Sequence, residues 1–490
     1  PQDDHYVAAV VEYEVQADAD INLQNYLRLT REASEQNADI IVFPEMTLTR
    51  GNRTVSVPIF GILKEYPVPA DRSDLYDEIL VSLSQAAKQN SIYVVVNLQE
   101  ILNCNDAPGE YCPEKKVYTF NTNVVFDRNG AVIDRYRKIN LFGEFTRTPA
   151  LKPDLGIFST DFGVTFGHYI CFDLMFQVPA IQVVEKHNIT DIVFSTMWFS
   201  EMPYLTGESF TILSNIYLLF PRFFFSGSGI YSGKAGALVS IMPGQPTTRL
   251  LVAKVPKIPG KVTESYPGPI YDNPSDHDSL LLKSDPSLAS YISRPLVPGF
   301  QEFTLVDKEV SCRFRIKLNQ RNGENSYEYR AVAFSGVRTY DGVATGGVRV
   351  CAVISCTGDT IESCGKRFSK YEVNTTATFE ELSIVASAPT PKMVTELNAQ
   401  DSVFYPITLR PSIMPLEVKD YDYEVKTVGI STDYTLSLKN LEAELYTFAV
   451  WGRVFERDGQ EPTPPLEGSS YRMLYSSVLV IAALSVNMLL

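Results

Sequence analysis

The amino-acid sequence predicts an α/β domain followed by a smaller domain built of strands. In the first part of the chain, short apolar runs typical of buried strands alternate with segments of helical periodicity. Beyond about residue 302, short β-branched and aromatic runs follow one another between turns. The stretch 256–298 holds eight prolines and little periodicity, which is typical of a linker or a wrapping loop. The predicted units are an α/β domain at 1–255, a linker or wrapping segment at 256–301, a β-rich domain at 302–460 and a tail at 461–490.

The first hundred residues contain three predicted strands and two predicted helices. The runs 6–15, 39–45 and 91–99 are apolar almost throughout, as strands of a buried sheet require. Segments 22–36 and 73–90 place apolar residues at helical spacing. Asp20 is available near the N-cap of the first helix.

The alternation of strands and helices continues to about residue 231. Runs 122–126 and 131–137 flank Asn129-Gly130, a dipeptide that favours a tight hairpin turn. The next predicted elements are a strand at 164–170, a helix beginning near 178, a strand at 191–195, a helical stretch through about Leu219 and a Gly-Ser segment at 226–231. In the β-rich domain, the predicted strands lie at 303–306, 313–318, 329–335, 348–355, 381–386 and 446–453.

The composition is that of a globular protein with a large core, since 45% of the 490 residues are hydrophobic and 21% are charged. A chain of this length is expected to form about two or three domains. The formal net charge of −15 argues against nucleic acid as a partner, because no basic stripe is available to replace phosphate counterions.

The seven cysteines indicate an oxidising compartment. With Cys171 set aside, six remain as one close pair and one cluster of four: Cys104 and Cys112, then Cys312, Cys351, Cys356 and Cys364. This even number fits three disulfides and one free thiol. A disulfide can close the polar loop 104–112, whereas the four clustered cysteines allow three pairings.

Three sequons and the two ends of the chain fit secretion. N-glycosylation is predicted at Asn52, Asn188 and Asn374. The chain starts with Pro and has no apolar run at its start, so a signal peptide is expected to be already absent. At the other end, small residues from Gly468 precede a short spacer and the apolar run 478–490. This pattern predicts a GPI-anchor signal with Gly468 as the candidate attachment site; the alternative is a tail-anchoring helix extended back to Met473.

Three polar residues stand where a buried α/β core does not tolerate them without a reason. Glu45 follows the strand-like run DIIVFP, Lys138 ends the run 131–137, and Cys171 lies on a strand-to-helix elbow. Groups at the carboxyl ends of strands converge on the ligand crevice of an α/β sheet. There, a carboxylate can accept the thiol proton, and an ammonium can stabilise both the thiolate and a substrate oxyanion.

Each of these residues also has a structural interpretation. Glu45 can be a helix cap or a surface carboxylate, Lys138 a solvated member of a basic cluster, and Cys171 a buried structural cysteine. Histidine-based chemistry has little support, since the chain has four histidines and no HExxH, GxSxG or C-x-x-C motif. His168 is expected to point to the opposite face of its strand from Cys171 and to be structural.

Taken together, the motifs carry a resemblance to a known family. FPE at 43–45, YRKINLF at 136–142 and CFD at 171–173 resemble the Glu–Lys–Cys motifs of the nitrilase superfamily, and within it the vanin/biotinidase family of secreted amidohydrolases. FSTMW at 194–198 and SGSGIY at 226–231 resemble later segments of that family's catalytic domain. The C-x4-C-x7-C spacing from Cys351 and WGRVFERD at 451–458 resemble its additional domain.

The resemblance implies an αββα-sandwich catalytic domain and a thioester mechanism without a metal or organic cofactor. In this scheme Glu45 is the general base and acid, Cys171 the nucleophile, and Lys138 with the backbone N–H of Phe172 the oxyanion site. Glu144 is the candidate for the family's second glutamate, although its spacing from the lysine is one residue shorter than expected. The residues after Glu45 also depart from the pattern expected of vertebrate vanins.

The leading hypothesis is an extracellular amidohydrolase that acts on a small linear amide, with pantetheine cleaved to pantothenate and cysteamine. One alternative is hydrolysis of biocytin or another biotinyl amide, and another is a catalytically inactive binding or adhesion protein at the cell surface. The predicted disulfides are Cys104–Cys112, Cys312–Cys351 and Cys356–Cys364. The oligomeric state stays open between a dimer paired through catalytic domains, as in many nitrilases, and a monomer.

Overall fold

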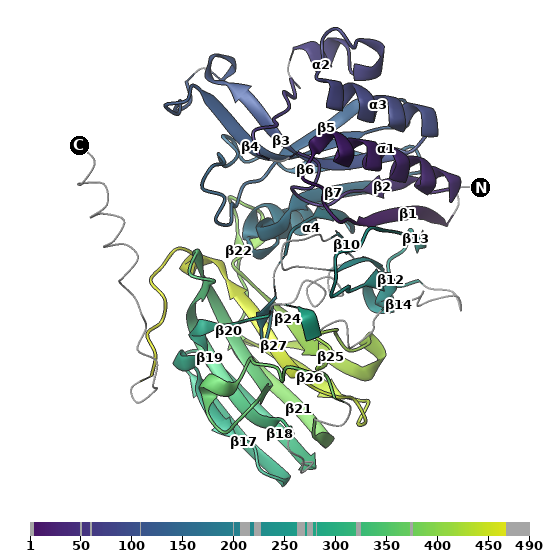
Figure 1. Cartoon of the computed structure of the whole chain (residues 1–490). Helices are drawn as coiled ribbons and strands as arrows, with labels where there is room; N and C mark the ends of the chain where they lie inside the picture. The colour runs from purple at the N-terminus through teal and green to yellow at the C-terminus, as the bar shows by residue number, and fades with distance from the viewer. Residues whose placement is uncertain are drawn as a thin grey trace, which may run out of the picture.

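The computed structural model shows two layered regions along the chain (Figure 1). It describes residues 4–49, 51–58, 61–107, 109–198, 200–205, 216–219, 227–261, 270–271, 278–280, 282–319, 325–372 and 376–466. The sequon at Asn374 and the tail from residue 467, with Gly468 and the run 478–490, lie outside these residues.

The first region is built on two sheets. One has the strand order β13-β1-β2-β3-β4-β5 and the other the order β14-β12-β11-β10-β8-β7-β6. Strands of the first sheet are β1 (His5–Glu12), β2 (Ile40–Val42), β3 (Tyr93–Asn103), β4 (Val117–Phe126), β5 (Val132–Arg137) and β13 (Arg249–Pro256). Strands of the second are β6 (Gly156–Ser159), β7 (Thr165–Ile170), β8 (Asp191–Ser195), β10 (Ile216–Leu219), β11 (Ser228–Tyr231), β12 (Ala237–Ile241) and β14 (Ile270–Tyr271).

These two sheets pack face to face between helices. Buried residues of β1, β2 and β3 meet buried residues of β6, β7 and β8 in one core, with Val10 and Phe166 as examples. The other face of the first sheet packs against helices α1 (Ala19–Glu35) and α3 (Glu78–Asn90), and α2 (Ile62–Glu65) lies between them in the chain. Helix α4 (Gln182–His187) covers the second sheet, because Gly167 leaves room for the Val183 side chain against β7. The predicted αββα sandwich is therefore confirmed.

The N-cap of α1 and the segment after β8 differ from prediction. Asp18, not Asp20, caps α1, and its carboxylate accepts the N–H of Asp20 at 2.8 Å. The predicted helical stretch through about Leu219 is wrong in its described part: β9 (Glu201–Met202) folds back on Leu205, and β10 pairs with β8. A short, continuously apolar run fits a central strand as well as a helix, so its periodicity does not separate the two.

The C-terminal region is a sandwich of two antiparallel five-stranded sheets. One sheet has the order β16-β19-β20-β27-β24, with β16 (Ile292–Pro295), β19 (Glu328–Tyr340), β20 (Ala344–Cys356), β24 (Ser402–Leu409) and β27 (Thr447–Val454). The other has the order β17-β18-β21-β26-β25, with β17 (Gly299–Asp307), β18 (Val310–Asn319), β21 (Thr378–Pro389), β25 (Tyr421–Val428) and β26 (Ser431–Leu438). Two short pairs complete the described strands: β15 (Lys283–Ser284) with β9, and β22 (Met393–Val394) with β23 (Ala399–Gln400).

Three disulfides are present among the described residues, and they join the predicted cysteines. Cys312 of β18 and Cys351 of β20 link the two sheets of the C-terminal sandwich, with their Cα atoms 5.4 Å apart. Cys104–Cys112 closes the loop after β3, and Cys356–Cys364 closes the loop after β20. Cys171 is the free cysteine of the chain.

The two regions share buried contacts. The Arg453 side chain of β27 donates from Nε to the carbonyl of Met175 at 2.8 Å, and Thr447 donates to the carbonyl of Pro203 at 2.8 Å. Met175 ends the short helix that Cys171 begins. The C-terminal sandwich therefore packs directly against the elbow that carries the predicted nucleophile. Within the described ranges, none of the helices combines the length and apolar character needed to cross a bilayer.

Candidate active site

Cys171 lies where strand β7 ends and a 3-10 helix, Cys171–Met175, begins. Its backbone φ is 47°, in the left-handed region that residues other than glycine rarely adopt. The buried carboxylate of Asp173 accepts hydrogen bonds from the Tyr136 hydroxyl at 2.7 Å and from the Asn140 backbone N–H at 2.8 Å. Both donors belong to the segment around Lys138, so Asp173 ties the cysteine elbow to the lysine segment.

Glu45, Lys138 and Cys171 are brought together from the ends of three strands. Lys138 Nζ donates to Glu45 Oε1 at 2.9 Å. Cys171 Sγ donates to the carbonyl of Met197 at 3.7 Å, and the Met197 N–H donates to Glu45 Oε2 at 2.7 Å. The exposed fractions of the three residues are 2%, 2% and 7%. They therefore form one nearly dry cluster in which the thiol and the carboxylate share Met197 as a neighbour.

Glu144 and Asn121 complete this cluster. Glu144 Oε2 accepts from Lys138 Nζ at 2.7 Å. Asn121 Nδ2 donates to Glu45 Oε1 at 2.7 Å and to Glu144 Oε1 at 2.6 Å. Glu144 thus lies beside the lysine and shares the Asn121 amide with Glu45. Sequence reasoning missed Asn121, although two asparagines within one strand-like run, Asn121 and Asn123 of β4, were an available signal.

A second buried asparagine orients the first. Asn97 Nδ2 donates to Asn121 Oδ1 at 2.8 Å and to Asn123 Oδ1 at 3.0 Å. Asn97 Oδ1 in turn accepts the Met46 N–H at 2.8 Å. Because the Asn121 oxygen is engaged by Asn97, its NH₂ group faces the two carboxylates.

The charges of the cluster follow from its burial. Burial raises the pKa of the Cys171 thiol to about 12; the Glu45 carboxylate adds to this rise and the Lys138 ammonium opposes it. Burial alone disfavours the ammonium of Lys138, but Glu45, Cys171 and Glu144 together raise its pKa well above the ordinary value. Burial likewise opposes ionisation of the Glu144 carboxyl. The Lys138 ammonium outweighs this effect of burial, so the pKa of Glu144 is lowered. The resting site therefore holds an ammonium ion and a neutral thiol.

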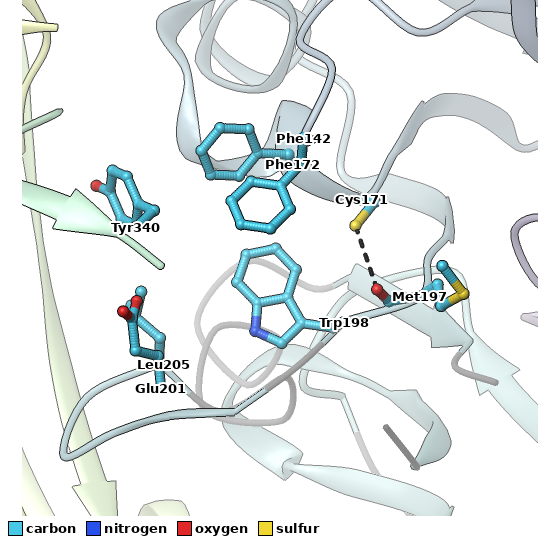
Figure 2. A pocket seen from close by; sticks show the side chains of 8 residues that line it. All are labelled: Phe142, Cys171, Phe172, Met197, Trp198, Glu201, Leu205 and Tyr340. Atoms are coloured by element: carbon cyan, nitrogen blue, oxygen red, sulfur yellow. Dashed lines mark hydrogen bonds between the residues drawn. The ribbon is translucent and has the colours of Figure 1, made fainter. Parts of the chain in front are cut away.

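The Cys171 thiol opens into a pocket with about 340 Å³ of empty space, part of it open to solvent (Figure 2). The pocket is lined by Phe142, Cys171, Phe172, Met197, Trp198, Glu201, Leu205 and Tyr340. The Phe172 ring forms part of the wall, packed edge to face on Phe142 and on Tyr340. Tyr340 belongs to β19, so both regions of the chain build this pocket.

The other predicted positions lie away from the cluster. Asn52 and Asn188 are exposed, as glycan attachment requires. His168 Nε2 lies 2.8 Å from Asp134 Oδ2, and the ring is fully buried. The histidine therefore makes a structural contact between β7 and β5.

Comparison with known proteins places the chain in a family. The carbon-nitrogen hydrolase model matches residues 7–206, and the vanin C-terminal domain model matches residues 280–458. Vanin-like protein 2 of Drosophila melanogaster is 32% identical over 493 residues, which cover 93% of this chain and 90% of that protein. The chain belongs to the vanin family. It is accordingly a hydrolase of carbon–nitrogen bonds.

More distant relatives of this vanin-family chain have named activities. Human biotinidase is 28% identical over 484 residues, which cover 89% of this chain and 84% of that enzyme. Bovine (Bos taurus) pantetheinase is 27% identical over 467 residues, which cover 88% and 83% of the two chains. Among solved structures, an amidase from Nesterenkonia sp. matches 52% of this chain and 92% of its own at 19% identity, with a TM-score of 0.38.

Proposed function

We propose that this vanin-family chain is an extracellular amidase that cleaves pantetheine to pantothenate and cysteamine through a thioester on Cys171. The proposal rests on one observation: a cysteine on a strained elbow shares a buried cluster with Glu45 and Lys138. The relatives named pantetheinase support the substrate class. Three disulfides fit an oxidising compartment outside the cytosol.

The first half of the reaction forms the thioester. Because burial raises the pKa of Cys171 to about 12, a thiolate is not present beforehand, and Glu45 takes the thiol proton as Sγ attacks the amide carbon. Two of the three N–H groups of the Lys138 ammonium donate to Glu45 and Glu144. The third N–H group is available to the developing oxyanion. The Phe172 N–H, in the first turn of the 3-10 helix, is the second donor proposed for that oxygen.

The second half releases the acid. As the tetrahedral intermediate collapses, the C–N bond breaks and protonated Glu45 gives its proton to the departing amine. Glu45, ionised again, takes a proton from water as the water oxygen attacks the thioester carbonyl. The C–S bond then breaks, Cys171 recovers its proton, and the carboxylic acid leaves. Asn121 and Glu144 keep Glu45 and Lys138 in place during both halves.

Two alternatives remain for the same site. Hydrolysis of a biotinyl amide such as biocytin is favoured by the biotinidase relatives, whose identity to this chain matches that of the pantetheinases. A catalytically inactive surface protein is the other alternative, and the complete set of Glu45, Lys138 and Cys171 argues against it.

The test uses the purified protein with pantetheine, biocytin and a simple aliphatic amide. We expect amine release from pantetheine, an acyl adduct on Cys171 detected by mass spectrometry after acid quench, and no turnover by Cys171→Ala. His168→Gln is the matched control, because it changes a buried polar residue on the same strand that makes no contact with the cluster. Equal turnover by wild type and C171A would remove Cys171 as the nucleophile, and no turnover of any amide by wild type would favour the inactive alternative.

The cellular setting is also a proposal. We propose glycans at Asn52, Asn188 and Asn374 and a GPI anchor attached near Gly468 at the cell surface. Release of the protein from intact cells by a phosphatidylinositol-specific phospholipase would support the anchor. Retention after that treatment, with release by detergent alone, would favour the tail helix. Size-exclusion chromatography with light scattering separates the monomer from the dimer.

A further inference from the structure

The pocket beside Cys171 ends in a carboxyl group. In Figure 2, Cys171 lies at one end, and Glu201 and Tyr340 lie at the other. Between the two ends lie the rings of Phe142, Phe172 and Trp198. An extended substrate that reaches from the thiol along these rings therefore meets Glu201.

The Glu201 carboxylate is held by the C-terminal sandwich. Arg338 of β19 donates from Nη2 to Glu201 Oε2, and the Asp341 N–H donates to Glu201 Oε1 at 3.1 Å. Arg338 also pairs with Asp285 Oδ2 at 3.2 Å and lies 4.7 Å from the centroid of the Tyr340 ring. Glu201, Arg338 and Asp285 are 2%, 0% and 3% exposed. Two carboxyl groups thus face one guanidinium, which leaves an excess of negative charge at this end of the pocket when both carboxyls are ionised.

The direction of the reaction decides which part of the substrate meets Glu201. In the proposed function, Glu45 gives its proton to the amine that leaves. The wall of the pocket, as given by the described residues, includes neither Glu45 nor Lys138. We accordingly place the departing amine on the Glu45 side of the thiol and the acyl arm in the pocket.

We infer that Glu201 selects the acyl arm of the substrate: it accepts a hydrogen bond from a hydroxyl or amino group at the end of the arm and excludes an arm that ends in a carboxylate. A carboxylate has about four lone-pair sites, so Arg338 and the Asp341 N–H leave capacity for another donor. The surrounding aromatic wall offers a second anionic group little compensation for lost hydration. The pantothenoyl arm ends in a hydroxyl group and meets this requirement. The inference rests on the proposed function.

The test compares amides that share one amine and differ only at the far end of the acyl chain. The chains are of matched length and end in hydroxyl, methyl or carboxylate. Burial raises the pKa of Glu201 to about 7, so the assays are run at alkaline pH, where the carboxyl is ionised. The measured quantity is the ratio of kcat/KM between two chains, because this ratio is independent of the fraction of active enzyme.

Wild type is expected to prefer the hydroxyl-ended chain over the carboxylate-ended chain by at least about tenfold. Glu201→Gln, which keeps the shape and removes the charge, is expected to lower this ratio by about tenfold. Glu309→Gln is the matched control. Glu309 also accepts hydrogen bonds from arginine side chains, those of Arg349 and Arg457, but it does not line the pocket. The kcat/KM ratio of E309Q is therefore expected to equal that of wild type within about twofold.

Three outcomes overturn the inference: a wild-type ratio near one, an E201Q ratio equal to that of wild type, or the same change of ratio in E309Q. The second of these outcomes, if E201Q also loses thermal stability, assigns the Glu201–Arg338–Asp285 cluster a purely structural role. Failure of the proposed function has a different signature: no chain is hydrolysed by wild type, or Cys171→Ala hydrolyses all of them equally.

Discussion

Replacing Asn121 by Leu is expected to impair catalysis and stability together, because one amide group serves two buried carboxylates. Asn121 Nδ2 donates to Glu45 Oε1 at 2.7 Å and to Glu144 Oε1 at 2.6 Å, and the side chain is fully buried. A hydrogen bond to a charged group contributes about 1.5–3 kcal/mol. Loss of both bonds is therefore expected to lower the free energy of unfolding by about 3 kcal/mol or more.

The catalytic effect of Asn121→Leu has a definite sign. The lost Asn121 donor helps to lower the pKa of Glu144, so the protonated form of Glu144 persists to higher pH in the variant. A loss of about 1.5 kcal/mol is expected to move the acid limb of the kcat/KM profile up by about one pH unit, so the fall in activity is largest on that acid limb.

The assay for this prediction is the pH dependence of kcat/KM for amide hydrolysis, with unfolding by urea measured in parallel. Asn123→Leu is the matched control. Asn123 is equally buried and lies two residues along the same strand, but it contacts Asn97 and neither carboxylate. The acid limb of the kcat/KM profile of N123L is expected to lie at the same pH as that of wild type. The reasoning fails if N121L keeps the wild-type acid limb, or if N123L moves it equally.

Three further predictions follow from other contacts. Because burial raises the pKa of Cys171 to about 12, its alkylation by iodoacetamide, followed by mass spectrometry, should be slow at neutral pH and keep rising into alkaline pH; a plateau near neutrality would contradict this. Removal of the Cys312–Cys351 disulfide by two Ala substitutions should lower the free energy of unfolding in guanidinium by about 4 kcal/mol, given the separation of 39 residues; a loss under about 1 kcal/mol would refute the chain-entropy argument. Lys138 lowers the pKa of Glu144 in the folded state, so this group stabilises the fold above its ordinary pKa and the contribution is lost as pH falls through its folded pKa. Glu144→Gln should therefore show a flatter decline of stability toward acid than wild type, and parallel urea-unfolding curves would exclude this.

The sequence was most informative where strands end in polar residues. Glu45, Lys138 and Cys171 each follow a strand-like run, and groups at the carboxyl ends of strands converge on the ligand site of an α/β fold. Here they come from β2 and β5 of one sheet and from β7 of the other. Strand β8 (Asp191–Ser195) and the β-rich character of the C-terminal region were likewise predictable from short apolar, β-branched and aromatic runs. These inferences need only local pattern and a general rule of α/β architecture, which explains why they agree with the structure.

The parts that escaped prediction depend on which strands become neighbours. Asn121 is one of three buried asparagines in β3 and β4, and its role appears only once the antiparallel pairing sets Asn97 opposite Asn123. The segment after β8 was misassigned because an apolar run carries no period that separates a central strand from a helix. Pairing partners and register are set by tertiary packing, so they cannot be predicted from a single sequence.

A buried arginine shows how far sequence reasoning can be carried into the second domain. Arg338 of β19 is fully buried, and a buried guanidinium requires carboxylate partners. The burial of Arg338 therefore requires acidic groups to meet this strand, and the sequence does not show which ones, since Glu201 lies 137 residues away. Those partners come from the loop that lines the pocket and from the segment before β16. Removing the C-terminal sandwich would leave Glu201 without Arg338 and would remove Tyr340 from the wall of the pocket, so the substrate pocket depends on the second domain.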